Sequence, residues 1–137
     1  MTVTSSADQL AIDRVERLLA DHDPGTPKPR DLLGAQFDAG LAWVHFPVGR
    51  GGLGLEPSAQ RPVNERLRAA GAPEAYWHNP IGHGMGAPTV LMHGRQEQQE
   101  RHLRPLFTGE EIWCQLFSEP GAGSDVAGLS GRAVRDG

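Results

Sequence analysis

Several kinds of residue are scarce in this chain of 137 residues, and each shortage excludes a class of protein. The single cysteine, Cys114, excludes an internal disulfide and fits a reducing compartment. No apolar run approaches the roughly 20 residues that a helix needs to span a bilayer, so membrane insertion is not expected. The first residues show neither a secretory signal nor an Arg-rich transit pattern, and we predict a cytoplasmic protein.

Basic residues are also few, and all but Lys28 are arginines. The net charge of −4 gives no reason to expect nucleic-acid binding, which needs a basic surface. The arginines are scattered along the chain, so solvated side chains account for them better than an anion-binding cluster. With 38% hydrophobic and 22% charged residues, the composition is typical of an ordinary folded domain.

Glycine and proline are abundant, with 18 and 11 residues, so we expect helices separated by many turns. Ser6 and Gln9 form a Ser-x-x-Gln capping box, which predicts the start of a first helix. The apolar residues on its inward face are Leu10, Val15, Leu18 and Leu19. The Asp-Pro-Gly sequence at residues 23–25 is expected to end it.

Four further helices are predicted. The second spans residues 30–43, with Leu32, Leu33, Phe37 and Leu41 facing inward. Pro57 suits the start of the third, but Pro62 would then lie inside it at a cost of about 3 kcal/mol. We therefore predict a start near Pro62 and an end at Gly71. Two short helices follow, at residues 89–93 and 96–103.

The last 28 residues differ in character. The apolar run at residues 112–117 is short and rich in branched and aromatic residues, which predicts a buried strand. A turn-rich loop at residues 119–125 and a second strand at residues 132–135 follow. Asp136 and Gly137 form a hairpin signal with no strand after it, so we expect a sheet cut short. The predicted fold is mainly α: an N-terminal α-helical domain in residues 1–109, then the beginning of a truncated β-domain in residues 110–137.

The loop at residues 119–125 is the most informative motif. Pro120, Gly121 and Gly123 let the backbone turn sharply, and small residues permit a ligand to approach closely. Successive N–H groups in such turns cradle anions, and Ser124 adds a hydroxyl donor. Spacing alone leaves two interpretations open, an ordinary tight loop and a phosphate or cofactor site.

Three ordered motifs carry a family resemblance. The first is Gly51-Gly52-Leu53-Gly54-Leu55. The second is Gly94, then Gln98, then Leu103-x-Pro105-Leu106-x-x-Gly109-Glu110. The third is Cys114-x-x-x-Ser118-Glu119-Pro120-x-Ala122-Gly123-Ser124-Asp125, followed by Ala133-x-x-Asp136-Gly137. In this order, from about Leu32 to Gly137, the chain resembles the acyl-CoA dehydrogenase family.

The resemblance implies a helical domain followed by a β-domain and a C-terminal four-helix bundle, with FAD between the β-domain and the bundle. The implied cofactor-binding residues are Gln115, Leu116, Phe117, Ser118, Gly123 and Ser124. The first four meet the flavin ring through their backbone, helped by the Ser118 hydroxyl. Gly123 and Ser124 face the FAD pyrophosphate, and Ser124 also faces the pantetheine arm of an acyl-CoA substrate.

The family's reaction is the α,β-dehydrogenation of an acyl-CoA thioester. Its usual base is a Glu in the C-terminal bundle, so no residue of this chain inherits that role. Glu119 belongs to the turn motif and is rejected as a base, because a base must reach the proton. We expect an inactive fragment that retains FAD weakly or not at all, in a homo- or hetero-oligomer. The alternative is a non-catalytic interaction subunit or a truncated reading frame that pairs with a full-length relative.

Other motifs are weaker. Gly49, Gly51 and Gly54 match a dinucleotide-binding fingerprint, but proline-rich sequence follows where a helix should begin. The six histidines show no metal-ligand spacing and are interpreted as surface or packing residues. Ser124 lacks the flanking glycines of a hydrolase nucleophile. The large apolar residues Tyr76, Trp77, Met85 and Met92 are interpreted as core, with an acyl-chain wall as the alternative.

The sequence departs from the family pattern at two places. Pro62 is expected to interrupt a helix that relatives run smoothly. Residues 46–50 lack the acidic pair that commonly precedes the first motif. Both departures bear on local packing.

Overall fold

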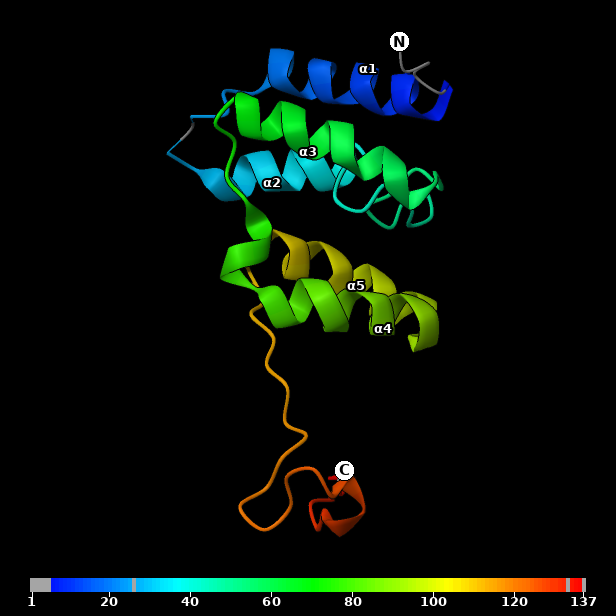
Figure 1. Ribbon diagram of the computed structural model, residues 1–137, viewed down its shortest axis with the longest axis vertical. Helices are drawn as coiled ribbons and strands as arrows, with labels where there is room; N and C mark the ends of the chain where they lie inside the picture. Colours follow the sequence, from blue (N-terminus) through cyan, green and yellow to red (C-terminus); the bar gives the residue numbers. More distant parts are fainter. Residues whose placement is uncertain (1–5, 26, 133, 137) are drawn as a thin grey trace.

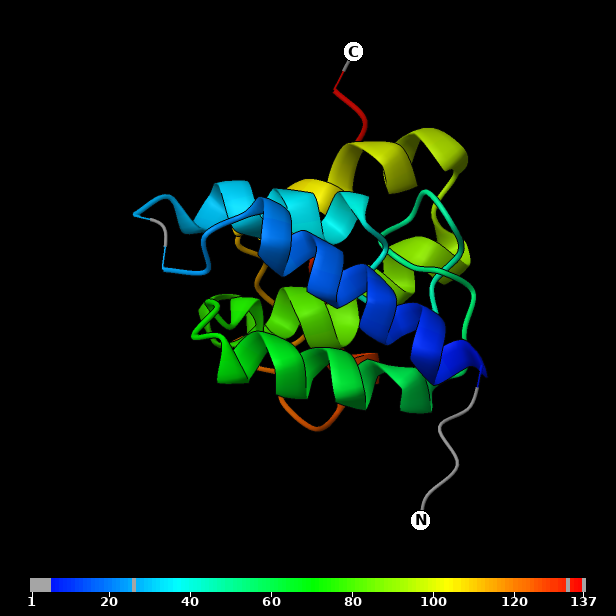
Figure 2. The ribbon, with the colours of Figure 1, turned by 90° about the horizontal axis from the view of Figure 1, so that it is seen from above.

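The computed structural model describes residues 6–25, 27–132 and 134–136, and its helices form two layers (Figure 1). The first layer contains α1 (Ser6–Asp21), α2 (Pro29–Asp38) and α3 (Gln60–Ala69). The second contains α4 (Ala87–His93) and α5 (Gln96–Thr108). Seen from above, α1 runs between α2 and α3 (Figure 2). We call residues 6–109 the helical body and residues 110–136 the C-terminal arm.

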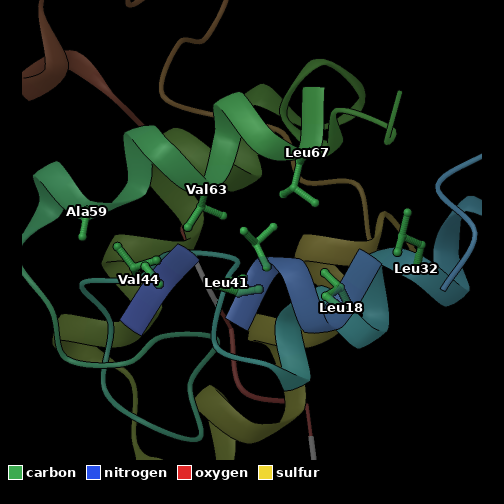
Figure 3. Close-up of a cluster of buried hydrophobic side chains, with 9 residues drawn as sticks. Leu18, Leu32, Leu41, Val44, Ala59, Val63 and Leu67 are labelled. Carbon is green, nitrogen blue, oxygen red and sulfur yellow. The ribbon is translucent and has the colours of Figure 1, made fainter. Parts of the chain in front are cut away.

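A first hydrophobic cluster holds α1 to α3 and to the turns after α2 (Figure 3). Its largest side chains are less than 2% exposed and include Leu32, Leu41, Val15, Val44 and Val63. Leu41 and Val44 lie after α2 and outside any helix, yet they pack in this cluster against α1 and α3. The loop of residues 39–56 therefore forms part of the core.

A second cluster joins α2 to the α4–α5 layer. It is formed by Leu33, Phe37, Ala42, Phe46, Ala87, Leu103, Leu106 and Phe107. Adjacent residues of α2 face opposite clusters, because Leu32 packs in the first and Leu33 in the second. A helix that is apolar on both sides must lie between two layers, so α2 is the central element of the body.

The first helix begins at Ser6 and ends before residues 23–25, as predicted. Val15 and Leu18 are buried, but the prediction for Leu10 is wrong, since its side chain is 43% exposed. Ala11 takes its place at 0% exposure, because residues 11, 15 and 18 follow the i, i+4, i+7 spacing of one helix face. The amide of Gln9 donates to Asp13 at 2.7 Å.

The second helix ends five residues earlier than predicted, at Asp38 instead of Trp43. Gly40 has a φ of 77°, the left-handed conformation that commonly ends helices. A Cβ atom there would lie 2.7 Å from the carbonyl oxygen of Gly52, so the same glycine also permits a close backbone contact. Leu41 is buried as predicted, but from the turn that follows the helix.

Both prolines near the third helix are accommodated. Pro57 opens a 3-10 turn, Pro57–Ala59, and α3 starts at Gln60, two residues before the predicted start. Pro62 is the third residue of α3, where the backbone N–H has no partner within the helix and its loss costs little. The expected interruption at Pro62 is therefore wrong. Gly71, just after the helix, has a φ of 77°, which agrees with the predicted end.

The α4–α5 layer is more helical than predicted. A π-helix, Gly82–Gly86, leads directly into α4, and a 3-10 turn, Ala75–His78, precedes it. The fifth helix continues to Thr108, five residues beyond the prediction, and Gly109 then ends it with a φ of 75°. Its start is capped, because the backbone N–H of Arg95 donates to the side chain of Gln98 at 2.9 Å.

The predicted strand at residues 112–117 is not formed. After Trp113 these residues run away from the body without a neighbouring strand (Figure 1), and Leu116 and Phe117 are 85% and 60% exposed. A strand needs a neighbour for its backbone groups, and the described residues offer none. Of the second predicted strand, Arg132, Val134 and Arg135 form no strand, and Ala133 lies outside the described residues, as does Gly137 of the hairpin signal. The mainly α prediction holds, whereas the start of a β-domain stays a prediction.

Candidate functional site

The glycine-rich loop of the arm is closed by a tight turn. Glu119 and Ala122 exchange two backbone hydrogen bonds, of 2.9 and 3.0 Å, around Pro120 and Gly121. Ala122 is only 4% exposed because the loop folds over it. The loop thus keeps its shape without contact with a sheet.

The carboxylate of Glu119 joins the start of this loop to residues 130–131. It accepts hydrogen bonds from the backbone N–H and the hydroxyl of Ser130, at 3.0 and 2.9 Å, and from the N–H of Gly131 at 2.6 Å. These donors stabilise the ionised form and lower the pKa of Glu119, and the backbone N–H of Ser130 contributes most. Glu119 therefore has a structural role that occupies both of its carboxylate oxygens.

The predicted cofactor-binding residues are exposed on the arm. They are Gln115, Leu116, Phe117, Ser118, Gly123 and Ser124. Within the described part of the chain, the backbone groups of residues 115–118 form no hydrogen bond, and none joins them to Gly123 or Ser124. A Cβ atom built on Gly121 or Gly123 would meet nothing within 4 Å. The arm thus presents free main-chain donors and open space next to two serine hydroxyls.

The place where the arm leaves the body is tightly organised around Asn79, which is 1% exposed. Its Nδ2 donates to the carbonyl oxygens of Leu106 and Glu111, both at 3.0 Å. Its Oδ1 accepts from the N–H groups of Gly82, at 3.2 Å, and Trp113, at 3.1 Å. Sequence reasoning missed Asn79, because its partners lie far along the chain and no local motif singles it out.

Glu111 forms a second anchor beside Asn79. Its carboxylate accepts from Arg101 and from the indole N–H of Trp113 at 3.2 Å, and His102 Nδ1 lies 3.0 Å from it. Partial burial opposes ionisation, but the hydrogen bonds from His102, Arg101 and Trp113 outweigh it and lower the pKa of Glu111. The first residues of the arm are therefore held by both backbone and side-chain contacts.

The body also contains a cavity of about 460 Å³, between α3 and the turn at residues 72–77. Trp43, Tyr76, Phe107 and the buried His83 are among its lining residues. The His83 ring packs 5.3 Å from Phe107 and 5.5 Å from Trp43, and its Nε2 has no hydrogen-bond partner. Burial lowers the pKa of His83 to about 4, against a backbone hydrogen bond with Phe107, so the ring is neutral near pH 7.

The core interpretation of four large apolar residues is wrong. Tyr76, Trp77, Met85 and Met92 are 48%, 72%, 42% and 73% exposed. They lie on α4 or on the segments before it, Ala75–His78 and Gly82–Gly86. The alternative, an acyl-chain wall, stays a prediction.

The described residues contain neither a membrane-spanning helix nor a cluster of metal ligands. No helix in the described ranges has the length and apolar character needed to cross a membrane. Over the same ranges, no three His, Cys, Asp or Glu residues gather as metal ligands would.

Known proteins match this chain in sequence and in fold. The family model "Acyl-CoA dehydrogenase, N-terminal domain" matches residues 2–110. Acyl-CoA dehydrogenase FadE34 of Mycobacterium tuberculosis is 42% identical over 106 residues, which are 74% of this chain and 14% of that protein. Acyl-CoA dehydrogenase IpdE1 of Mycolicibacterium smegmatis is 39% identical over 92 residues, 67% of this chain and 23% of that protein.

A solved structure, the Tcur3481-Tcur3483 steroid ACAD, shares the fold with a TM-score of 0.53 and 24% identity, over 100% of this chain and 38% of its own. The chain spans between 14% and 34% of the length of seven curated relatives that it matches. Because the family model covers most of the sequence, the chain belongs to the acyl-CoA dehydrogenase family and carries its N-terminal helical domain.

Proposed function

We propose that the chain supplies the N-terminal helical domain of an FAD-dependent acyl-CoA dehydrogenase, and that its C-terminal arm meets the flavin nucleotide. The contacts would come from the backbone of Gln115, Leu116 and Phe117, from Ser118, and from the turn at Gly123 and Ser124. The substrate class is an acyl-CoA thioester, with Ser124 beside its pantetheine arm.

The observation that carries this proposal is the unpaired donor set of the arm. Backbone N–H groups without an internal partner suit the carbonyl and nitrogen acceptors of a flavin ring, and serine hydroxyls suit a pyrophosphate. The open surroundings of Gly121 and Gly123 leave room for a ligand to approach the backbone. The residues present therefore fit the cofactor that the family uses.

Bound FAD would accept a hydride from the β-carbon of the thioester while a carboxylate removes the α-proton. Glu119 does not suit that second role, because hydrogen bonds from Ser130 and Gly131 occupy its carboxylate. We infer that the base lies outside these 137 residues and that the chain does not catalyse the reaction alone. Its relatives are several times longer, which supports this inference.

The test compares FAD binding by the complete gene product, by the 137-residue chain, and by single serine variants of the complete gene product. We expect the gene product to bind FAD with a flavin spectrum in the visible, and the 137-residue chain to retain none. Ser118→Ala should weaken FAD binding about tenfold through one lost hydrogen bond. The control is Ser58→Ala, an exposed serine of the turn Pro57–Ala59, which should leave FAD affinity unchanged.

Two results would contradict the proposal at different levels. A complete gene product that takes up no FAD overturns it entirely. Stoichiometric flavin on the 137-residue chain alone overturns only the inference that this chain is insufficient. Equal FAD affinity of Ser118→Ala and Ser58→Ala removes Ser118 from the site.

A further inference from the structure

Three segments converge where the arm leaves the helical body. They are the end of α5, the π-helix Gly82–Gly86, and residues 111–113. The side-chain amide of Asn79 bonds to all three and uses both of its donors and both acceptor positions of its oxygen. A buried amide with every group satisfied holds its partners in one arrangement, because each alternative leaves a polar group unpaired.

Two glycines of the π-helix make room for this contact. A Cβ atom on Gly82 would lie 2.4 Å from the Asn79 amide. One on Gly86 would lie 3.0 Å from the Trp113 ring and 3.3 Å from Leu106. Because Gly82 and Gly86 have no side chain, the wide turn of the π-helix fits the amide of Asn79 on one side and the indole of Trp113 on the other.

Beyond Trp113, no hydrogen bond joins the described residues of the arm to the helical body. Trp113 is held by its backbone N–H on Asn79 and by its indole N–H on Glu111. From residue 114 to residue 118, the described chain makes no hydrogen bond, and the next bonds belong to the turn at Glu119. Trp113 is thus the last fixed point before Gln115.

We propose that Asn79, supported by Glu111, is a positioning residue that sets the path of residues 114–118 relative to the helical body and so places their donors toward the flavin. The placement toward the flavin rests on the proposed function, whereas the hold on the arm does not. Asn79 itself touches no reacting atom. It acts through the backbone of Trp113.

The first experiment uses the 137-residue chain. A nitroxide spin label is attached to its single cysteine, the exposed Cys114. Asn79→Ala should narrow the electron paramagnetic resonance lines of the label. It should also accelerate amide exchange at Trp113 on the order of tenfold. Glu111→Gln, which keeps the core intact, should give a smaller change of the same sign.

The matched control is Gln36→Ala. Gln36 is also a buried amide, 7% exposed, but it donates within the body, to the carbonyl oxygen of Leu41 at 3.1 Å. It should lower stability without mobilising the label. Equal mobilisation by Asn79→Ala and Gln36→Ala overturns the proposal, because general loosening would then explain both. If Asn79→Ala does not fold, the label mobility of Glu111→Gln is compared with that of Gln36→Ala instead. Equal mobility in these two variants then overturns the proposal.

The second experiment measures FAD affinity in the complete gene product. Asn79→Ala should lower that affinity about tenfold, while Gln36→Ala leaves it unchanged. A mobilised label with unchanged FAD affinity overturns the positioning role. If the unsubstituted gene product binds no FAD, the proposed function has failed, and the label alone then decides whether Asn79 holds the arm.

Discussion

The helical body and the C-terminal arm both contain large apolar side chains, but only the body gathers them into buried clusters. In the body, Leu103 and Leu106 are 0% exposed between α2 and α5. In the arm, Leu116 and Phe117 are mostly exposed, although residues 112–117 are at least as apolar as the sequence of α5. The difference lies in what surrounds each segment: helices satisfy their own backbone groups and need only a face to pack on, whereas an extended segment also needs hydrogen-bonding neighbours. The arm uses polar contacts at its two ends instead.

The sharpest test of this contrast is a pair of leucine deletions. Leu106→Ala should lower the free energy of unfolding by about 3 kcal/mol, because it removes a fully buried side chain and leaves a cavity in the second cluster. Leu116→Ala in the arm should change it by less than about 0.5 kcal/mol. Urea denaturation measures both. A loss of stability in Leu116→Ala as large as that in Leu106→Ala would show that the side chain of Leu116 is buried in solution, against the helical body or a second molecule.

A second prediction concerns pH and the buried ring of His83. Its pKa falls from 6.5 to about 4 in the folded chain, so the unfolded state binds the proton more readily. The contribution of His83 to the free energy of unfolding should be at its full value above pH 6.5 and should be lost as the pH falls toward 4, by about 3 kcal/mol in total. His83→Phe should remove that share of the slope. Identical slopes of stability against pH from 6.5 to 4 in both proteins would contradict the assignment.

Glycine substitutions extend the comparison to the backbone. At Gly52 a Cβ atom would lie 2.0 Å from the carbonyl oxygen of Phe46, where no flexible side chain can move aside. Gly52→Ala should therefore destabilise the body by about 2 kcal/mol. Gly121→Ala in the arm meets nothing within 4 Å and should stay within about 0.5 kcal/mol of the unsubstituted chain. Thermal unfolding of the two variants distinguishes a packed turn from an open one.

The same contrast explains what the sequence could predict. The start of α1 near Ser6 and the end of α3 at Gly71 follow from local signals, a capping serine and a glycine that ends a helix. The predicted strand at residues 112–117 is not formed, because a strand depends on partners that no local pattern contains. Asn79 escaped notice for a related reason: three of its four side-chain bonds reach residues 27 to 34 positions away, and only folding brings them together. The flavin-contact residues were chosen by resemblance and remain a prediction.

The smallest expected effect is confined to the arm itself. The pKa of Glu119 lies below the ordinary value of 4.5, chiefly because the N–H groups of Ser130 and Gly131 donate to its carboxylate. Because its pKa is lowered in the folded chain, ionised Glu119 stabilises the loop above pH 4.5, and this support is lost as the pH falls through the lowered pKa. The amide resonance of Gly131 should therefore shift with a midpoint below 4.5, and Glu119→Gln should abolish the transition while leaving the unfolding of the helical body unchanged. A midpoint at or above 4.5 would mean that Glu119 does not close the loop in solution, and the glycine turn would then owe its shape to the Glu119–Ala122 backbone pair alone.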